Sequence, residues 1–260
     1  MNAVDAVALG RSRLKVSKLC FGTAYLGAPS LKISPDEGGR VLVEAHKLGV
    51  TFWDTSDDYG SHAHIASALR HIPREKVVIS TKTSAKNGRE AAESLQRSLR
   101  ELGTDYVDIF FLHAVESDWI DGCHKLLTEL HELTTAGTVK AIGLTTHSVA
   151  VGRKASEFEQ LDVLMTICCG ADQATIDRFP EHIPLEDGTI EQMLEAAELA
   201  HSRGIGIVAM KVLGCSAPPL VDDYRASIEA VTKLRFVDAI VIGMRSLCEV
   251  QKNVEAVMSR

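Results

Sequence analysis

Four side chains of complementary chemistry stand in the first half of the sequence: Asp54, Tyr59, Lys82 and His113. A tyrosine hydroxyl has an ordinary pKa of about 10, and a neighbouring ammonium lowers that pKa because it favours the phenolate. A buried ammonium in turn needs a carboxylate partner, and a histidine can orient a substrate oxygen. Together the four residues predict a site that delivers a proton to an aldehyde or ketone, with the hydride supplied by a cofactor because no side chain can supply one.

Taken singly, each of these residues also has an ordinary structural role. Asp54 can cap a turn, Lys82 can extend its ammonium into water from the edge of a sheet, and His113 can be a hydrogen-bonded core residue. Asp54, Lys82 and His113 each end an apolar run, and Tyr59 follows five residues after Asp54. The positions of these runs in the fold therefore decide between the catalytic and the structural interpretation.

Composition narrows the classes of protein. The 260 residues carry a formal net charge of −7, which argues against a protein that binds a nucleic-acid backbone. No apolar stretch reaches the roughly 18 residues of a membrane span, and the first residues contain no signal-peptide core. The six cysteines stand at no zinc or iron–sulfur spacing. We therefore expect no metal, no membrane contact and a reduced chain in the cytoplasm.

Short apolar runs alternate with helical patterns along nearly the whole chain. The runs are continuous, as in VVIS, DIFFL and IGIVAM, which is typical of parallel strands covered on both faces. Eight strands are predicted, over residues 18–23, 51–54, 77–82, 106–113, 139–145, 161–167, 205–211 and 239–243.

Helix signals fill the intervals between these runs. Apolar residues recur with helical spacing over 190–200, and capping boxes begin at Ser34 and Thr189. Eight strand–helix units of about 32 residues each match the typical size of an α/β protein with the (β/α)8 fold, the TIM barrel. A doubly wound open sheet is the alternative. It is disfavoured because no GxGxxG sequence follows the first strand and no P-loop occurs.

Two segments interrupt the alternation. Residues 7–17 resemble a short β-hairpin ahead of the first barrel strand, with its turn at residues 10–12, and residues 168–186 form a long irregular connection. Such long loops are usually functional. No linker, repeat or low-complexity tract is present, so residues 1–260 are expected to form one domain.

Six segments resemble, in order, those of the aldo-keto reductases: LGRSRLKVSKLCFGT, TFWDTSDDYG, VVISTK, DYVDIFFLH, VKAIGLTTH and VIGMRSLCEVQKN. The similarity runs from about residue 8 to residue 257, in the manner of short microbial members that lack a C-terminal extension. It implies a (β/α)8 enzyme that uses NADPH, or less often NADH, to reduce a small carbonyl compound to an alcohol. It also implies that Asp54, Tyr59, Lys82 and His113 are the catalytic tetrad.

The resemblance further implies contacts with the cofactor. Thr146 departs from the asparagine usual at its position, and Met210 stands where many members have an aromatic ring on the nicotinamide. His147 could replace the missing amide or could cap the next helix. The residues implied for the nicotinamide and pyrophosphate are Gly22, Thr23, Asp54, Thr145, Thr146, Met210, Lys211, Leu213 and Gly214.

Opposing charges mark the expected position of the adenosine phosphate. Gly243, Met244, Arg245 and Ser246 precede the last helix, so that a 2′-phosphate would meet a guanidinium, a hydroxyl and a helix N-terminus. Glu249 would repel it, unless its carboxylate turns to the Ser246 backbone in a capping box. Asn253, one turn later, matches an adenine contact of the family. These signals favour NADPH over NADH.

The substrate pocket is expected to be open, with Tyr25 and Trp119 as candidate walls beside Tyr59 and His113. The partners expected are the carbonyl or alcohol substrate and, at most, further copies of this chain. Two other functions remain open at this point. One is a nicotinamide-binding regulatory subunit with slow turnover, and the other is an unrelated metal-dependent barrel, for which Asp54 and His113 alone provide too few ligands.

Overall fold

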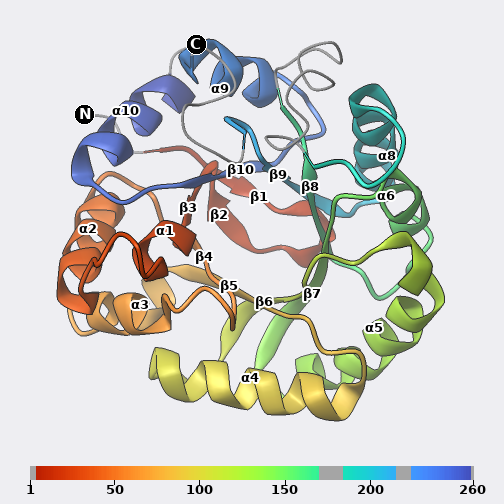
Figure 1. Ribbon diagram of the computed structural model, residues 1–260, viewed down its shortest axis with the longest axis horizontal. Helices are drawn as coiled ribbons and strands as arrows, with labels where there is room; N and C mark the ends of the chain where they lie inside the picture. Colours follow the sequence, from red (N-terminus) through yellow and green to blue (C-terminus); the bar gives the residue numbers. More distant parts are fainter. Residues whose placement is uncertain (1–3, 170–183, 215–223, 259–260) are drawn as a thin grey trace.

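Eight parallel strands close into a barrel, as the sequence predicts (Figure 1). The computed structural model describes residues 4–169, 184–214 and 224–258. The strand order around the barrel follows the chain, and β10 closes the ring against β3. The barrel strands are β3 (Leu19–Gly22), β4 (Phe52–Asp54), β5 (Val78–Thr83), β6 (Val107–Leu112), β7 (Val139–Thr146), β8 (Val163–Ile167), β9 (Gly206–Met210) and β10 (Ala239–Gly243).

Helices surround the barrel, and local capping signals define several of their ends. Both predicted capping boxes are present, Ser34 with Glu37 and Thr189 with Gln192. Gly103 ends one helix in the left-handed conformation, at φ 67°. The helices are α1 (Ala24–Gly27), α2 (Pro35–Lys47), α3 (His62–Leu69), α4 (Gly88–Leu102), α5 (Ile120–Thr135), α6 (Val149–Ala155), α8 (Ile190–Ser202), α9 (Tyr224–Thr232) and α10 (Leu247–Met258).

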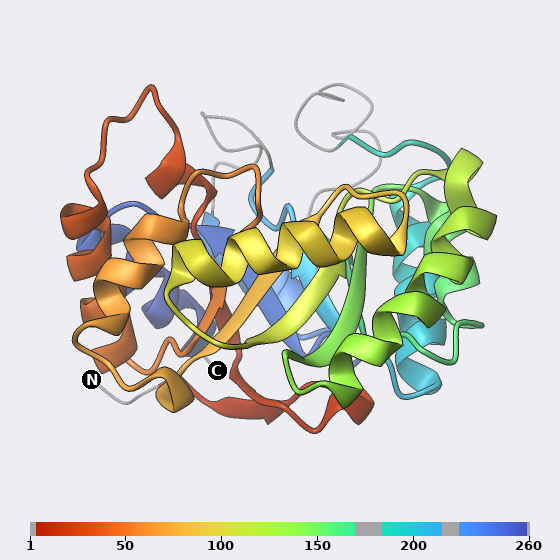
Figure 2. The ribbon, with the colours of Figure 1, turned by 90° about the horizontal axis from the view of Figure 1, so that it is seen from below.

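The predicted N-terminal hairpin covers the end of the barrel where the strands begin. Strand β1 (Ala6–Ala8) pairs antiparallel with β2 (Lys15–Ser17), and Figure 2 shows the pair at the end opposite to α1. Gly10 lies against the start of β9, where a Cβ atom would come within 2.2 Å of the Gly206 nitrogen. The Arg11 guanidinium donates to the carbonyls of Glu159 and Leu161. The hairpin therefore closes this end and leaves the other end for a site.

Two apolar layers hold the barrel in shape. Inside it, Phe52, Phe111, Met165 and Val208 belong to one fully or nearly fully buried cluster. A larger cluster lies between the strands and the surrounding helices. No helix of the described ranges is long and apolar enough to cross a membrane. Most of the expected long connection, residues 170–183, lies outside the described residues.

Candidate active site

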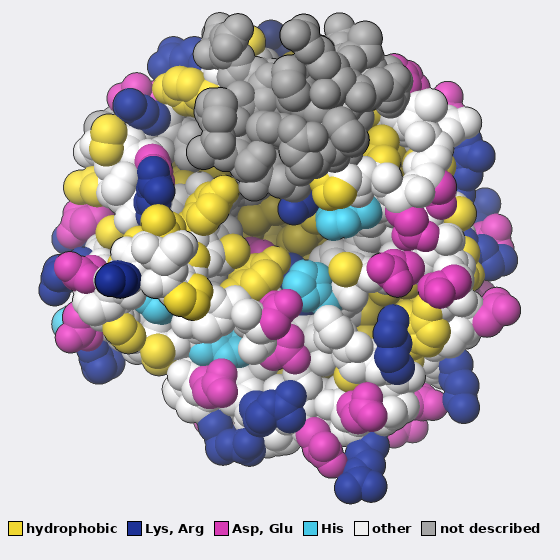
Figure 3. Space-filling view, viewed as in Figure 1, with side chains coloured by type: hydrophobic (Ala, Val, Ile, Leu, Met, Phe, Trp, Pro, Cys, Tyr) yellow, Lys and Arg dark blue, Asp and Glu magenta, His cyan; other side chains and the backbone are white. Residues whose placement is uncertain are grey.

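The carboxyl ends of β4, β5 and β6 bring the four predicted residues to one rim of the barrel. Asp54 is the last residue of β4, Lys82 lies near the end of β5, and His113 directly follows β6. Tyr59 stands in the connection between β4 and α3. Parallel strands of a barrel end at the same face, so residues up to 59 positions apart become neighbours there. Figure 3 shows a hollow at this face with histidine and acidic side chains at its border.

Asp54 and Lys82 form a buried ion pair. The Lys82 Nζ lies 2.6 Å from Asp54 Oδ2, and the two residues are 1% and 4% exposed. Lys82 also donates to the Thr55 carbonyl at 2.7 Å, and the Ser80 hydroxyl donates to the second Asp54 oxygen. Burial alone would lower the pKa of Lys82, but Asp54 and Tyr59 raise it above its ordinary value. Lys82 is therefore a permanent cation at neutral pH.

Tyr59 lies between this cation and His113. The Lys82 Nζ is 4.6 Å from the centre of the tyrosine ring, and the His113 ring meets Tyr59 edge-on at 5.7 Å. Burial raises the pKa of Tyr59, Lys82 lowers it, and the net pKa is above the ordinary value. The ammonium thus acts in the direction that the sequence predicts, but desolvation outweighs it. At neutral pH Tyr59 is therefore protonated and can act as a proton donor.

His113 has two neighbours that sequence reasoning missed. Its Nδ1 lies 3.3 Å from the Ser56 hydroxyl and 3.7 Å from Asp58 Oδ2. When Ser56 donates to Nδ1, the proton of the neutral ring resides on Nε2. Burial and then Lys82 lower the pKa of His113, whereas Asp58 raises it. The signal in the sequence was the run TSDDYG, in which both residues stand between Asp54 and Tyr59.

Replacing Asp58 by asparagine is expected to lower the pKa of His113 further, because Asp58 is one of the charges that raise it. Protonation of the ring then moves to more acid pH. An NMR titration of the His113 ring in both proteins measures the change. Asp105→Asn, at an exposed position away from the rim, should leave the titration unchanged. An identical His113 pKa in Asp58→Asn and wild type would contradict this coupling.

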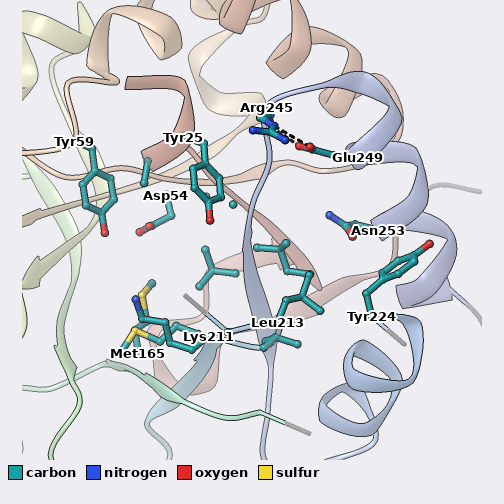
Figure 4. A pocket seen from close by; sticks show the side chains of 18 of the residues that line it. Tyr25, Asp54, Tyr59, Met165, Lys211, Leu213, Tyr224, Arg245, Glu249 and Asn253 are labelled. Carbon is teal, nitrogen blue, oxygen red and sulfur yellow. Dashed lines mark hydrogen bonds and ion pairs between the residues drawn. The ribbon is translucent and has the colours of Figure 1, made fainter. Parts of the chain in front are cut away.

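A cavity of about 690 Å³ extends from Tyr59 and Asp54 to the start of α10 (Figure 4). Gly22 and Gly243 pair in register at the ends of β3 and β10, so that bare backbone forms part of its wall. This volume lies within the usual range of small-molecule and cofactor sites. The predicted residues that line the cavity are Gly22, Tyr25, Asp54, Tyr59, Met210, Lys211, Leu213, Gly214, Gly243, Arg245, Glu249 and Asn253.

The other predicted cofactor residues do not line this cavity, because their side chains serve the fold. The Thr23 hydroxyl is bonded to the Asp54 carbonyl and to Ser61. The Thr145 hydroxyl accepts from the Ala114 amide, and the Thr146 hydroxyl donates to the Val115 carbonyl. The Met244 side chain is fully buried, and Ser246 accepts from the Glu249 amide as a cap.

Glu249 does not face the Ser246 backbone, so this expectation is wrong. Its carboxylate accepts from the Arg245 amide at 2.8 Å and from the Arg245 guanidinium Nε at 3.1 Å. Figure 4 shows the pair at the rim of the cavity. Because the carboxylate also makes a charge-assisted bond to the guanidinium, the acid neutralises part of the expected phosphate site.

The two residues predicted to line the substrate pocket lie in different places in the structure. Tyr25 lines the cavity but packs on Gly243, where a Cβ atom would lie 2.6 Å from the ring, so it faces the expected cofactor. Trp119 is absent from the lining, and the Lys86 Nζ lies 4.0 Å above its ring. Sequence reasoning missed Met165 and Tyr224, which line the cavity from β8 and α9. Neither residue belongs to a sequence motif that could have identified it.

His147 does not cap the next helix. Ser148 caps α6 with its own hydroxyl. Burial, Lys211 and His113 lower the pKa of His147 to about 4, so the ring is neutral at pH 7. Among the described residues no cluster of histidine, cysteine and acidic side chains could hold a metal ion.

Comparison with known proteins identifies the family to which this barrel belongs. The sequence model of the aldo/keto reductase family matches residues 18–218, so the chain belongs to this family. It is 26% identical to an L-galactose dehydrogenase of Arabidopsis thaliana, over 99% of this chain and 89% of the relative. It is 25% identical to an NADH-specific methylglyoxal reductase of Escherichia coli, over 74% and 67% of the two chains.

A solved structure has the same fold over its whole length. A candidate aldo-keto reductase from Pseudomonas aeruginosa superimposes with a TM-score of 0.81 at 25% identity, covering 99% of this chain and 97% of that one. The expected family and the expected (β/α)8 barrel are thereby confirmed.

Proposed function

We propose that this protein reduces aldehydes or ketones to alcohols with a nicotinamide cofactor, and that Tyr59 donates the proton. The observation that carries the proposal is the buried Asp54–Lys82 ion pair, at 2.6 Å, beneath the ring of Tyr59. A buried charge pair is costly to desolvate. Here the pair places the Lys82 ammonium beside Tyr59, the proposed proton donor, which lines the cavity.

The chemistry follows from these positions. The bound nicotinamide would supply the hydride to the carbonyl carbon. The carbonyl oxygen would lie between the Tyr59 hydroxyl and His113 Nε2, and Tyr59 would transfer its proton to that oxygen as negative charge develops there. Lys82 stabilises the resulting phenolate, which then recovers a proton from water. In the direction of alcohol oxidation the same groups act in reverse.

For the cofactor we propose NADPH, with NADH used less well. Arg245 supports this preference because its guanidinium, half exposed at the cavity rim, is suited to a phosphate. Glu249 opposes it, since its carboxylate already bonds the guanidinium Nε. Asn253 and Tyr224 lie farther along the same end of the cavity, where they would hold the adenine half.

Replacing Arg245 by alanine is expected to raise the KM for NADPH by about tenfold or more, the loss of a charge-assisted hydrogen bond, with little change for NADH. Replacing Glu249 by glutamine should lower the KM for NADPH and spare that for NADH, because the repelling charge is gone. Steady-state kinetics with both cofactors measures both effects. Arg100→Ala, on α4, is a matched control. Equal losses for the two cofactors in Arg245→Ala would show that the phosphate lies elsewhere.

Turnover of a panel of aldehydes and ketones with each cofactor tests the proposed function. A regulatory protein would bind NADPH and quench its tryptophan fluorescence equally well, but would show little turnover. The proposed partner is the carbonyl or alcohol substrate, and the protein itself is a monomer or a homo-oligomer. The proposed location is the cytoplasm. This location is in keeping with the free thiols of Cys20, Cys123, Cys168, Cys169 and Cys248.

A further inference from the structure

Three hydroxyl groups form a buried chain of hydrogen bonds beside the catalytic tetrad. Ser61 Oγ lies 2.7 Å from Thr23 Oγ1 and 2.7 Å from Thr55 Oγ1. The Thr23 hydroxyl in turn donates to the Asp54 carbonyl at 2.9 Å. All three hydroxyl-bearing residues are 0% exposed, so bulk water does not compete for these hydrogen bonds.

The direction of the chain follows from its last bond. A serine or threonine hydroxyl has one proton to donate. Because the proton of Thr23 points to the Asp54 carbonyl, Thr23 accepts from Ser61, and Ser61 in turn accepts from Thr55. Hydrogen bonds that are linked in this way polarise and strengthen one another. The three hydroxyls therefore act as one unit, and removal of Ser61, the middle member, breaks both links.

The bond between Thr55 and Ser61 closes the segment that carries Tyr59. Thr55 directly follows β4, Ser61 directly precedes α3, and Tyr59 stands between them. The Thr55 carbonyl also accepts from the Lys82 ammonium at 2.7 Å. One hydrogen bond thus joins the start of α3 to the residue that holds Lys82, and it limits the span of the turn that places Tyr59 4.6 Å from that ammonium.

The bond between Ser61 and Thr23 holds the same segment from its other side. Thr23 stands at the N-terminus of α1. At the end of α1, Gly27 packs so closely on the segment that a Cβ atom would come within 1.9 Å of the Tyr59 carbonyl oxygen. The backbone of Tyr59 therefore lies directly against α1, and the Ser61–Thr23 bond ties the two together.

Ser61 makes these two bonds in place of a helix cap. It occupies the N-cap position of α3, where a serine ordinarily accepts from an amide of the first turn, yet its side chain makes no such bond. Ser34 and Ser148, at the same position of α2 and α6, do cap their helices. The Ser61 hydroxyl thus serves the segment of Tyr59 rather than α3.

We infer that Ser61 is a positioning residue for proton transfer, which holds Tyr59 against Lys82 and His113 although its own side chain is fully buried. This inference rests on the proposed role of Tyr59 as the proton donor. A displacement of about 1 Å in a reacting group can lower the rate about 100-fold. Loss of the hydroxyl chain should therefore appear in kcat.

Replacing Ser61 by alanine is expected to lower kcat for carbonyl reduction about tenfold or more. The KM for the carbonyl compound and the dissociation constant of NADPH should stay within about twofold of wild type, because Ser61 contacts neither. Steady-state kinetics and tryptophan quenching measure these values, with kcat referred to the concentration of folded protein from circular dichroism.

Ser67→Ala is the matched control for this variant. Ser67 lies farther along α3 and is also buried, and its hydroxyl donates to Asp36. Its replacement removes a hydrogen-bonded hydroxyl from the same helix and should leave kcat unchanged. Equal losses of kcat in the two serine variants, or a Ser61→Ala protein with the kcat of wild type, would overturn the inference.

Thr55→Val breaks the same chain with almost no change in side-chain shape. Each single variant should lower kcat, and the double variant should lose no more than the larger single loss, because both changes remove one unit. Losses that multiply would show that the hydroxyls act separately, contrary to the inference. If Ser61→Ala did not fold, Thr55→Val would decide alone, and an unchanged kcat in it would refute the role of the chain.

An NMR measurement separates this inference from the proposed function. The rings of Tyr59 and His113 have centres 5.7 Å apart, so a nuclear Overhauser contact between labelled tyrosine and histidine rings is expected, assigned by its loss in Tyr59→Phe. The contact should persist in Ser67→Ala and be clearly weaker in Ser61→Ala. If wild type reduced no carbonyl compound, the proposed function would fail and this contact would still test Ser61. A contact of the same strength in Ser61→Ala and wild type overturns the inference.

Discussion

Replacing Tyr59 by phenylalanine is expected to lower kcat for carbonyl reduction by about 10²–10⁴-fold, the usual contribution of a positioned proton donor. The ring keeps its edge-on contact with His113, so only the hydroxyl group is lost. The dissociation constant of NADPH should change little, because Tyr59 lies far from Arg245 at the other end of the cavity (Figure 4). Steady-state kinetics and fluorescence quenching measure the two effects.

Tyr106→Phe is the matched control for this variant. Tyr106 packs under Arg74 and Lys140 and has no part in the rim, so its hydroxyl should be dispensable for turnover. A Tyr59→Phe protein that kept most of its kcat would show that another group donates the proton.

Replacing Lys82 by methionine is expected to have the largest effect on stability and to leave only residual turnover. The change leaves the Asp54 carboxylate buried without its cation, and breaking a buried pair in this way costs about 3–5 kcal/mol of the free energy of unfolding. Urea denaturation measures this loss. Lys140→Met is the control, since Asp108 retains Arg74 when Lys140 is removed, and its loss should be much smaller.

The pH dependence of the residual activity of Lys82→Met separates catalysis from folding. Reduction needs protonated Tyr59, so activity falls as pH rises through the pKa of Tyr59. Lys82 lowers that pKa, and removing the ammonium should therefore move the fall in activity to higher pH. The double variant Asp54→Asn with Lys82→Met should recover stability without recovering turnover. A pH profile identical to that of wild type would contradict the coupling between Lys82 and Tyr59.

The sequence determined the architecture and the catalytic positions for local reasons. The buried strands are continuous apolar runs, and the caps at Ser34 and Thr189 bond groups only three residues away. Once these runs are parallel strands of one barrel, their carboxyl ends must meet at one face. Asp54, Lys82 and His113 could therefore be placed together without knowledge of any contact.

Side-chain partners were decided only by the tertiary structure. Thr145 and Thr146 could have faced a cofactor, but the Ala114 amide and Val115 carbonyl of the neighbouring loop take their hydroxyls. Glu249 could have bonded the Ser246 backbone, yet it bonds the guanidinium and amide of Arg245. The partners of the two threonines come from a segment 31 residues away in the sequence, and Glu249 bonds a charged group only four residues away.

The direction of the net pKa shifts was also decided only by the folded structure. From the sequence, a lysine beside Tyr59 predicts a lower pKa, whereas the pKa is raised because burial outweighs the ammonium. The pKa of His113 also depends on the fold, because its neighbours Ser56 and Asp58 come from the connection after another strand. A sequence shows which charges are present. The balance between desolvation and Coulomb attraction depends on depth and distance, and only the three-dimensional arrangement sets these.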